Sequence, residues 1–289
     1  MGALDLIKLA PLMQRTSGRS QITVGLIDGP VLLAHPDLAS QNIREVPGKL
    51  QGTCTIAESS ACLHGTFVAG VLFARRGSVA PAICPDCTLL VRPIFSEASR
   101  VNRDFPSAAP AELAQAIVDC VDAGARLLNL SAALAAPSSK RERELEEALR
   151  YAASLGAISV AAAGNQGTLG GSIITRHPAV IPVAACDLQA RPLNESNLGS
   201  SIARRGLMAP GVGITSLGTN GKLQTFGGTS AAAPFVTGAI ALLWSEFPGA
   251  DADQIKLAVV RAASGPRRVV APPLLDAWAA YQTIRANRA

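Results

Sequence analysis

The chain of 289 residues is 48% hydrophobic and 16% charged, so it can bury a large core and is neither disordered nor fibrous. Only 4% of its residues are aromatic, and its net charge of +5 comes from scattered arginine pairs, which argues against a stacking surface for nucleic acid. The chain shows neither a secretory signal nor a run of about 18 uncharged apolar residues. We therefore expect a cytoplasmic protein, or an excised catalytic domain, with no nucleic-acid or membrane partner.

Short apolar runs alternate with helical patterns along the chain. This alternation favours an α/β fold of three layers, in which helices cover both faces of a mainly parallel central sheet. The third helical pattern is amphipathic, with Ser139 as a possible cap and Gly156 at its end. The predicted strands span residues 22–27, 88–94, 126–131, 157–163 and 179–185, and the predicted helices span residues 64–75, 111–123 and 139–155.

No internal repeat or low-complexity linker divides the chain. We therefore expect a single domain over residues 1–289, with a core over about residues 20–262. The proline-rich residues 264–275 introduce a predicted C-terminal helix over about residues 274–286. The sequence indicates no particular oligomeric state.

Six cysteines are present, and four of them form local pairs. The pair in CPDC could be a redox or zinc motif, but no second such pair and no nearby histidine completes a zinc set. The interpretation we favour is local structural disulfides or reduced thiols, with no metal. The paired residues are Cys54, Cys62, Cys84 and Cys87, whereas Cys120 and Cys186 stand alone in apolar surroundings.

Four polar residues stand where predicted strands end or predicted helices begin. Asp28 directly follows the first strand, and Asn165 follows the strand over residues 157–163. His64 opens the helix HGTFVAGVLFA, and Ser230 opens the helix in GGTSAAAPFVTGAIALL. Because reactive groups collect beyond the carboxyl ends of the strands in such sheets, these four residues are the candidates for chemistry.

Each of these residues also has an ordinary structural explanation. A Thr–Ser pair before an apolar run is usually a helix N-cap, which alone would account for Thr229 and Ser230. Asp28 could be a turn former, and His64 could belong to a capped helix start. Asn165 fits a left-handed turn. Taken together, in this order and at these strand ends, the residues favour catalysis.

Five segments of the chain carry a family resemblance. They are GLIDGPVLLAHPDL, HGTFVAGV, LLNLSAA, AAAGN and GGTSAAAPFVTGAIALL. Their order and approximate spacing resemble those of a subtilisin-like serine peptidase, a subtilase, over about residues 20–245. Within that family, IDGP and CPDCTLLVRPIF are most similar to the leader-cleaving proteases of cyanobactin maturation. The resemblance implies a subtilisin-like fold and a serine peptidase.

The chemistry of the four candidates agrees with this resemblance. A serine hydroxyl is a poor nucleophile near neutral pH, so Ser230 needs an adjacent base, and His64 has a suitable intrinsic pKa. Asp28 would hold the imidazole in the required tautomer and stabilise the imidazolium. Free N–H groups at the helix start would bind an oxyanion beside Ser230, and Asn165 would add a side-chain donor in this oxyanion hole.

The resemblance also implies an edge along which an extended peptide binds. The residues expected there are Ser131, Ala132, Ala133, Ala162, Ala163 and Gly164. Residues 161–164 read AAAG and offer no carboxylate, so we expect cleavage after small or apolar residues rather than after Arg or Lys.

Two departures from the family pattern bear on the site. Gly29 stands where most subtilases carry Ser or Thr, directly after Asp28. Residues 67–78 are too few for the calcium-binding loop of many secreted relatives, so we expect no metal and no cofactor.

The sequence thus predicts a serine endopeptidase that forms an acyl-enzyme on Ser230 and processes the leader of a ribosomal precursor peptide. An acyl-transferring macrocyclase and an inactive peptide-binding module are the alternatives. Macrocyclising relatives of the cyanobactin type carry a helical insertion between the catalytic Asp and His. Residues 29–63 are rich in turn formers and lack the apolar period of packed helices, so we expect hydrolysis and linear products.

Overall fold

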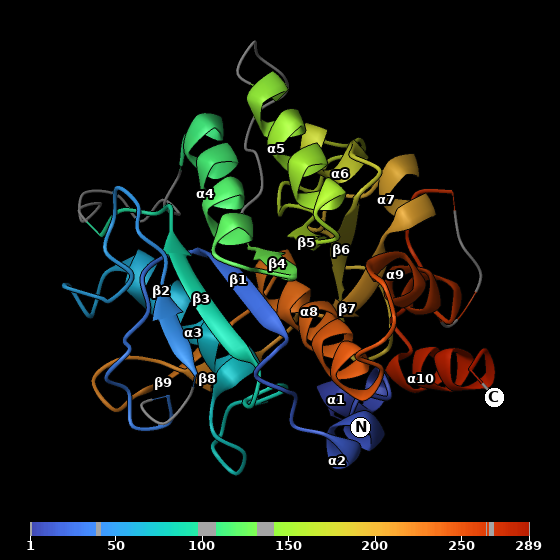
Figure 1. Cartoon of the computed structure of the whole chain (residues 1–289), viewed down its shortest axis with the longest axis horizontal. Helices are drawn as coiled ribbons and strands as arrows, with labels where there is room; N and C mark the ends of the chain where they lie inside the picture. The colour runs from blue at the N-terminus through green and yellow to red at the C-terminus, as the bar shows by residue number, and fades with distance from the viewer. Residues whose placement is uncertain are drawn as a thin grey trace.

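A seven-stranded sheet forms the centre of the computed structural model, which describes residues 2–38, 42–97, 108–131, 142–263, 265 and 269–288 (Figure 1). The strand order is β2-β3-β1-β4-β5-β6-β7, and each neighbouring pair is parallel. The carboxyl ends of all seven strands therefore meet at one edge. The strands are β1 Thr23–Asp28, β2 Ile43–Glu45, β3 Thr88–Pro93, β4 Leu127–Leu130, β5 Ile158–Ala162, β6 Val180–Cys186 and β7 Leu207–Pro210.

The five predicted strands correspond to β1, β3, β4, β5 and β6, each within one residue at either end. Their residues are buried throughout, because helices cover the parallel sheet on both faces, and the strands are accordingly rich in apolar residues. The two outermost strands, β2 and β7, were not predicted. β2 is three residues long and carries the exposed Arg44 and Glu45, so no apolar run marks it.

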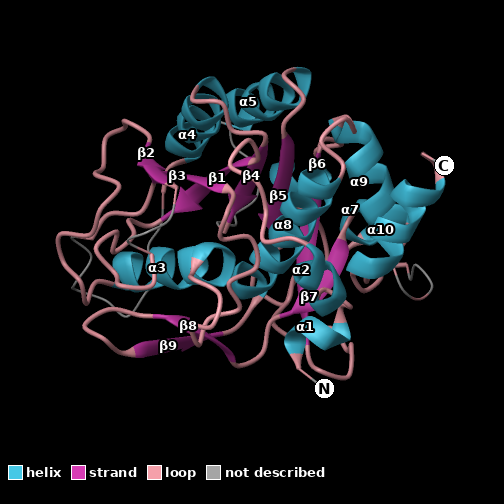
Figure 2. Ribbon diagram, turned by 60° about the horizontal axis from the view of Figure 1, so that its bottom comes forward, coloured by secondary structure: helices cyan, strands magenta, loops and turns pink. Residues whose placement is uncertain are grey.

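Helices cover both faces of the sheet (Figure 2). The apolar residues of the strands belong to two hydrophobic clusters, one on each face of the sheet, because successive side chains of a strand point to opposite faces. Leu26 packs in the cluster with α3 (Ser60–Phe73) and α8 (Thr229–Glu246), whereas Ile27 packs with α4 (Pro110–Asp122) and α5 (Glu142–Ser154). The predicted three-layer α/β fold is confirmed.

The start of α3 differs from the prediction. The helix begins at Ser60, because the Ser59 hydroxyl accepts a hydrogen bond from the backbone N–H of Cys62 and caps it. His64 therefore lies in the second turn rather than at the helix start. Helix α4 begins one residue before the predicted range, with Pro110 in its first turn. Ser139, the predicted cap of the third helix, lies outside the described residues.

The remaining elements are short or lie toward the chain ends. The predicted C-terminal helix corresponds to α10 (Ala277–Ala286), which begins at Ala277 because the Asp276 side chain accepts a hydrogen bond from Ala279 N–H. None of the helices in the described residues combines the length and apolarity needed to cross a membrane. The other elements are α1 Ala3–Leu6, α2 Ala10–Arg15, α6 Ile173–Arg176, α7 Ser200–Arg205, α9 Ala252–Arg261 and the antiparallel strands β8 Ile214–Leu217 and β9 Leu223–Phe226.

Candidate active site

Asp28, His64 and Ser230 form one chain of hydrogen bonds at the carboxyl edge of the sheet. Asp28 is the last residue of β1, His64 lies in α3, and Ser230 is the second residue of α8. His64 Nδ1 lies 2.7 Å from Asp28 Oδ1, and His64 Nε2 lies 3.0 Å from Ser230 Oγ. Asp28 is fully buried and His64 is buried, while Ser230 is partly accessible. This geometry can move a proton from the serine hydroxyl to the imidazole.

Two glycines allow the loop after β1 to approach α3. A Cβ added at Gly29 would lie 2.0 Å from the Ala61 carbonyl oxygen, and one at Gly65 would lie 2.4 Å from the Pro30 carbonyl oxygen. Gly29 N–H donates to Asp28 Oδ1 at 2.6 Å. Asp28 Oδ2 is buried and has no hydrogen-bond partner in the described part of the chain.

The electrostatics of His64 favour its role as a base that is regenerated after taking a proton. Burial alone would lower the pKa of His64, but the charge of Asp28 and the hydrogen bond to it outweigh burial, so the pKa is raised. The Phe226 ring lies against the imidazole, with 5.7 Å between ring centroids, and packs edge-on against Phe67 at 5.0 Å. These apolar rings cannot take part in proton transfer, so the imidazole acts through Nε2, the nitrogen that faces Ser230.

Ser230 occupies the N-terminal turn of α8 without capping it. The N-cap is Gly228, with φ of 87°, and neither Thr229 nor Ser230 caps the helix with its side chain. The N-cap interpretation of Thr229 and Ser230 is therefore wrong, since the chain turns into the helix one residue earlier. The free N–H groups of this first turn and the positive end of the helix dipole lie beside the Ser230 hydroxyl, where they favour negative charge.

Asn165 lies on the exposed segment that follows β5, with its amide turned toward α8. Its Oδ1 accepts hydrogen bonds from Thr229 N–H at 2.9 Å and from the Thr229 hydroxyl at 3.0 Å. These two bonds fix the orientation of the amide, and its donor atom, Nδ2, is left to donate to another group. The left-handed turn expected at Asn165 is made instead by Gly164, with φ of 105°. Asn165 is thus a side-chain donor held near Ser230.

Four of the six expected substrate-binding residues are described. Ser131 directly follows β4 and is buried, and its Oγ accepts a hydrogen bond from Asn129 Nδ2 at 2.7 Å. Ala162 ends the adjacent β5, and Ala163 and Gly164 follow it. Both alanines are buried, so they and Ser131 can offer mainly backbone groups to a ligand. Ala132 and Ala133 lie outside the described residues.

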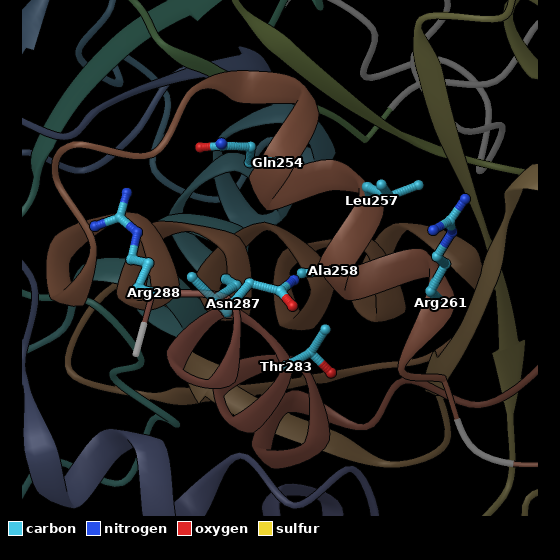
Figure 3. Close-up of a pocket in the computed structure, with 8 residues that line it drawn as sticks. Gln254, Leu257, Ala258, Arg261, Thr283, Asn287 and Arg288 are labelled. Atoms are coloured by element: carbon cyan, nitrogen blue, oxygen red, sulfur yellow. The ribbon is translucent and has the colours of Figure 1, made fainter.

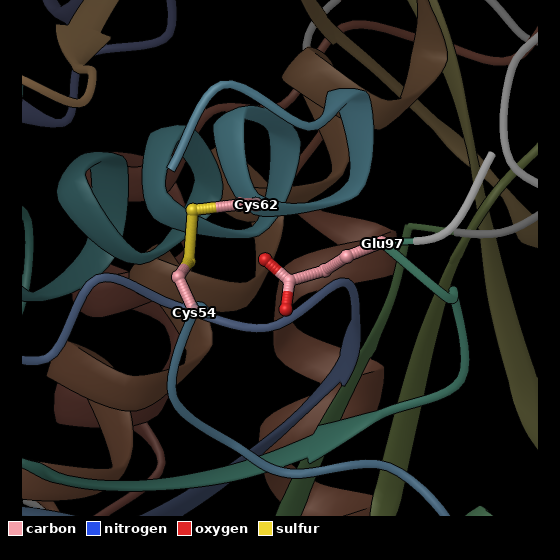
Figure 4. A group of neighbouring side chains, drawn as sticks. All are labelled: Cys54, Cys62 and Glu97. Carbon is pink, nitrogen blue, oxygen red and sulfur yellow. A yellow bond between two sulfur atoms is a disulfide. The ribbon is translucent and has the colours of Figure 1, made fainter. Parts of the chain in front are cut away.

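The two locally paired sets of cysteines differ in redox state. Cys54 and Cys62 form a disulfide at the first turn of α3 (Figure 4). Cys84 and Cys87 are free thiols, so of the two alternatives expected for this pair, a disulfide or reduced thiols, the second holds; both are buried, and burial raises the pKa of Cys84. Burial also raises the pKa of the remaining two thiols, Cys120 and Cys186, to about 12. The pKa of Cys87 is instead lowered, mainly by its hydrogen bond with Cys84. All four thiols are buried in the core, and the raised pKa values of Cys84, Cys120 and Cys186 disfavour these three as nucleophiles.

Glu97 holds the segment that the disulfide closes. Its carboxylate accepts hydrogen bonds from Thr55 N–H at 2.9 Å and Ile56 N–H at 2.8 Å, and from the Ser59 hydroxyl at 3.3 Å. Burial opposes the charge, but these bonds lower the pKa of Glu97. Glu97 lies beside both sulfurs, which are bonded to each other and so are not thiolate ligands for a metal.

A separate cavity of about 150 Å³ lies between α9 and α10 (Figure 3). Its lining contains no histidine, cysteine or carboxylate, so it lacks the groups that acid–base or nucleophilic catalysis needs. The lining residues are Gln254, Leu257, Ala258, Arg261, Thr283, Ile284, Asn287 and Arg288.

An Asp–His–Ser hydrogen-bond chain beside an amide donor, at the carboxyl edge of a parallel sheet, defines the class of serine hydrolases that work through an acyl-enzyme. The particular family follows from comparison: the chain belongs to the Peptidase S8 subtilase family, which matches residues 19–280. It is thereby one of the subtilisin-like serine endopeptidases.

Relatives and solved structures agree with this assignment. The chain is 32% identical to the thermophilic serine proteinase of Bacillus sp. (strain AK1) over 80% of its length, but spans only 54% of that protein. It is 28% identical to subtilisin DY of Bacillus licheniformis, covering 88% of this chain and 87% of subtilisin DY.

Two solved structures resemble the whole fold. A serine-to-alanine mutant of the protease domain of PatA superposes with a TM-score of 0.85 and 30% identity, covering 93% of this chain and 97% of that one. The prenylagaramide maturation protease PagA superposes with a TM-score of 0.82 and 28% identity, covering 96% of this chain and 98% of that one.

Two further residues shape the site, and no motif in the sequence marks either of them. Thr229 was considered only as a helix cap, although its hydroxyl orients the Asn165 amide. Phe226 packs against His64 from the end of β9. Neither has a local pattern that marks its role, because the partner of each lies more than 60 residues away in the chain.

Proposed function

We propose that this chain hydrolyses peptide bonds through an acyl-enzyme on Ser230. The observation that carries the proposal is the hydrogen-bond chain from Asp28 through His64 to Ser230. Ser230 Oγ attacks the scissile carbonyl while its proton passes to His64 Nε2, and His64 then gives that proton to the leaving amine. Water then attacks the acyl-enzyme while its proton passes to the same imidazole, and His64 returns that proton to Ser230 Oγ as the acid product leaves. Asp28 supports the imidazolium at each stage.

The oxyanion of each tetrahedral intermediate needs preorganised donors. Asn165 Nδ2 and the free N–H groups at the start of α8 are the donors we assign, and removing one such donor costs about 10²–10³ in kcat in subtilisin. The Asn165→Ala variant should therefore keep its KM and lose kcat on about that scale. An unchanged kcat would contradict the assignment.

The substrate is proposed to be a peptide that binds as an extended strand along the ends of β4 and β5, at Ser131, Ala132, Ala133, Ala162, Ala163 and Gly164. Backbone pairing gives affinity without requiring a particular sequence, and the small side chains leave room for a P1 group. No carboxylate lies among these residues, so small or apolar P1 residues are expected. A peptide-library profile dominated by Arg or Lys would contradict this.

We propose further that the substrate is a precursor peptide and that the enzyme removes its leader. The support is the similarity to PagA and PatA, solved as maturation proteases for prenylagaramide and patellamide, over nearly all of this chain. The IDGP and CPDC segments carry the same resemblance in the sequence.

Hydrolysis is favoured over macrocyclisation by the segment between Asp28 and His64. In its described parts, residues 29–38 and 42–63, the regular elements are β2 and the first turn of α3, and these parts contain no inserted helix. An uncovered acyl-enzyme stays accessible to water, which then competes with a tethered amine. Mass spectrometry of a cleaved precursor should show linear products; a predominantly cyclic product would support the macrocyclase.

One experiment separates this enzyme from an inactive peptide-binding module. A fluorophosphonate probe should label the wild-type chain and should not label Ser230→Ala, because only an activated serine reacts. Equal labelling of both would mean that Ser230 is not the nucleophile. Absence of labelling in both would favour the binding module.

We also propose that residues 1–289 form one peptidase domain that acts in the cytoplasm. Four buried free thiols suit a reducing compartment, whereas the Cys54–Cys62 disulfide is unusual there. Cell fractionation, with mass spectrometry of the 54–62 peptide, tests the location. Recovery outside the cytoplasm would refute it.

A further inference from the structure

The segment that carries Asn165 has little regular structure of its own. Residues 163–170 leave β5 and run beside residues 194–199, which connect β6 to α7. Backbone hydrogen bonds join the two segments, from Asn197 N–H to Gly164 O at 2.8 Å, from Gly167 N–H to Glu195 O at 2.8 Å and from Leu198 N–H to Thr168 O at 3.0 Å. The position of Asn165 therefore depends on the neighbouring segment.

The Asn197 side chain is the centre of this contact. Its Oδ1 accepts hydrogen bonds from Gln166 N–H at 3.1 Å, Thr168 N–H at 3.1 Å and the Thr168 hydroxyl at 3.0 Å. Its Nδ2 donates to Ala163 O at 3.2 Å and to Gln166 Oε1 at 2.6 Å. One amide thus ties the backbone on both sides of Asn165.

Gly164 makes room for this amide. A Cβ added at Gly164 would lie 2.3 Å from Asn197 Nδ2, and the φ of 105° also favours glycine. The Gly164 N–H donates in turn to the Thr229 hydroxyl at 3.1 Å. Thr229 therefore sets the rotation of the Asn165 amide, and Asn197 sets the backbone from which that amide projects.

We propose that Asn197 is a positioning residue for the oxyanion hole, acting on catalysis through Asn165. This inference rests on the proposed role of Asn165 as a donor. A preorganised donor is effective only where the oxyanion will form, and a misplacement of about 1 Å can cost about a hundredfold in rate. The contribution of Asn197 should therefore appear in kcat and should require the Asn165 side chain.

A double-mutant cycle tests this dependence. Asn197→Ala keeps the backbone bond to Gly164 and loses only the side-chain bonds, so it should fold and lose about tenfold or more in kcat, with KM changed much less. In the Asn165→Ala background the same substitution should change kcat by less than about twofold. Asn194→Ala, a change of the same residue type at an exposed position three residues earlier, should leave both constants unchanged.

Three results would overturn the inference: equal losses of kcat in both backgrounds, a change confined to KM, or a lowered melting temperature with kcat intact. If Asn197→Ala does not fold, Asn197→Asp keeps an acceptor for the Gln166 and Thr168 N–H groups and serves in the same cycle. If Asn165→Ala itself leaves kcat unchanged, the proposed oxyanion role fails. A loss in Asn165→Ala without one in Asn197→Ala would refute the positioning role alone.

Discussion

The two sides of the active site are held in place by different means. Asp28, His64 and Ser230 lie on β1, α3 and α8, whose residues pack in the buried core. Asn165 lies on an exposed segment whose position depends on polar side chains, Asn197 above all. A closely packed core is disturbed by added atoms, whereas a segment held by side-chain hydrogen bonds loses its position when one partner is removed. The reacting groups and the oxyanion donor should therefore respond to different substitutions.

The largest effect on catalysis is expected for the reacting groups, which the buried core holds in place. Ser230→Ala and His64→Ala should each lower kcat by about a millionfold, as in subtilisin itself, and the double variant should lose no more because the two act as a unit. Both should remain folded by circular dichroism, since neither adds an atom to the core. Turnover in His64→Ala well above the uncatalysed rate would contradict its role as the base.

Adding one carbon to the same side should damage both stability and catalysis. Gly65→Ala would place a Cβ against the backbone carbonyls of Pro30 and Gly29, which cannot move aside as a side chain can. We expect a loss of about 3 kcal/mol in the free energy of unfolding, together with a lower kcat. Denaturant unfolding and steady-state kinetics measure the two.

Gly77→Ala is the matched control for that substitution. Gly77 has a φ of 89° and nothing within 4 Å of an added Cβ, so it carries backbone strain without a clash. It should cost about 1–2 kcal/mol and leave kcat unchanged. A Gly65→Ala enzyme as stable and active as the wild type would show that the close approach of the loop to α3 is not required.

The disulfide tests whether the start of α3 needs a covalent link. Replacing Cys54 and Cys62 together by Ser should cost about 2–3 kcal/mol in the free energy of unfolding, by the loop-entropy argument. It should leave kcat nearly intact, because the hydrogen bonds to Glu97 still hold residues 55–59. Only in combination with Glu97→Ala should kcat fall. A fall without that second change would mean that the disulfide alone positions His64.

The smallest effect expected is a pH dependence that reports the Asp28–His64 pair. His64 must be neutral to act as a base, so kcat/KM should be lost as pH falls through its pKa, which is raised above the ordinary value. Because the folded pKa is raised, the pair stabilises the fold below about pH 6.5, and this contribution is lost as pH rises through the folded pKa. The measurement compares Ser230→Ala with the double variant Ser230→Ala/His64→Ala. The difference between their free energies of unfolding should shrink as the pH rises from the ordinary pKa of histidine through the raised pKa of His64.

The predictable part of this fold is the part with a local pattern. Five strands were predicted within one residue, because buried parallel strands contain short apolar runs such as VGLI in β1. The edge strand β2 and the pair β8–β9 lack such runs and depend on their neighbours. The predicted start of α3 is wrong because its cap, Ser59, stands next to a second serine, Ser60, and only its bond to Cys62 N–H distinguishes it.

The sequence by itself determined which groups are the candidates for the chemistry: Asp28, His64, Asn165 and Ser230 each stand at or near an element end that their own neighbours define. Only the tertiary structure decided how these side chains are oriented toward one another. The Asn165 amide is oriented by Thr229 and its backbone is tied by Asn197, while Gly65 lets His64 approach Asp28. These contacts join residues about 30 or more positions apart, and a hydrogen bond or a clash acts only over a few ångströms. Their effect therefore exists only once the chain has folded.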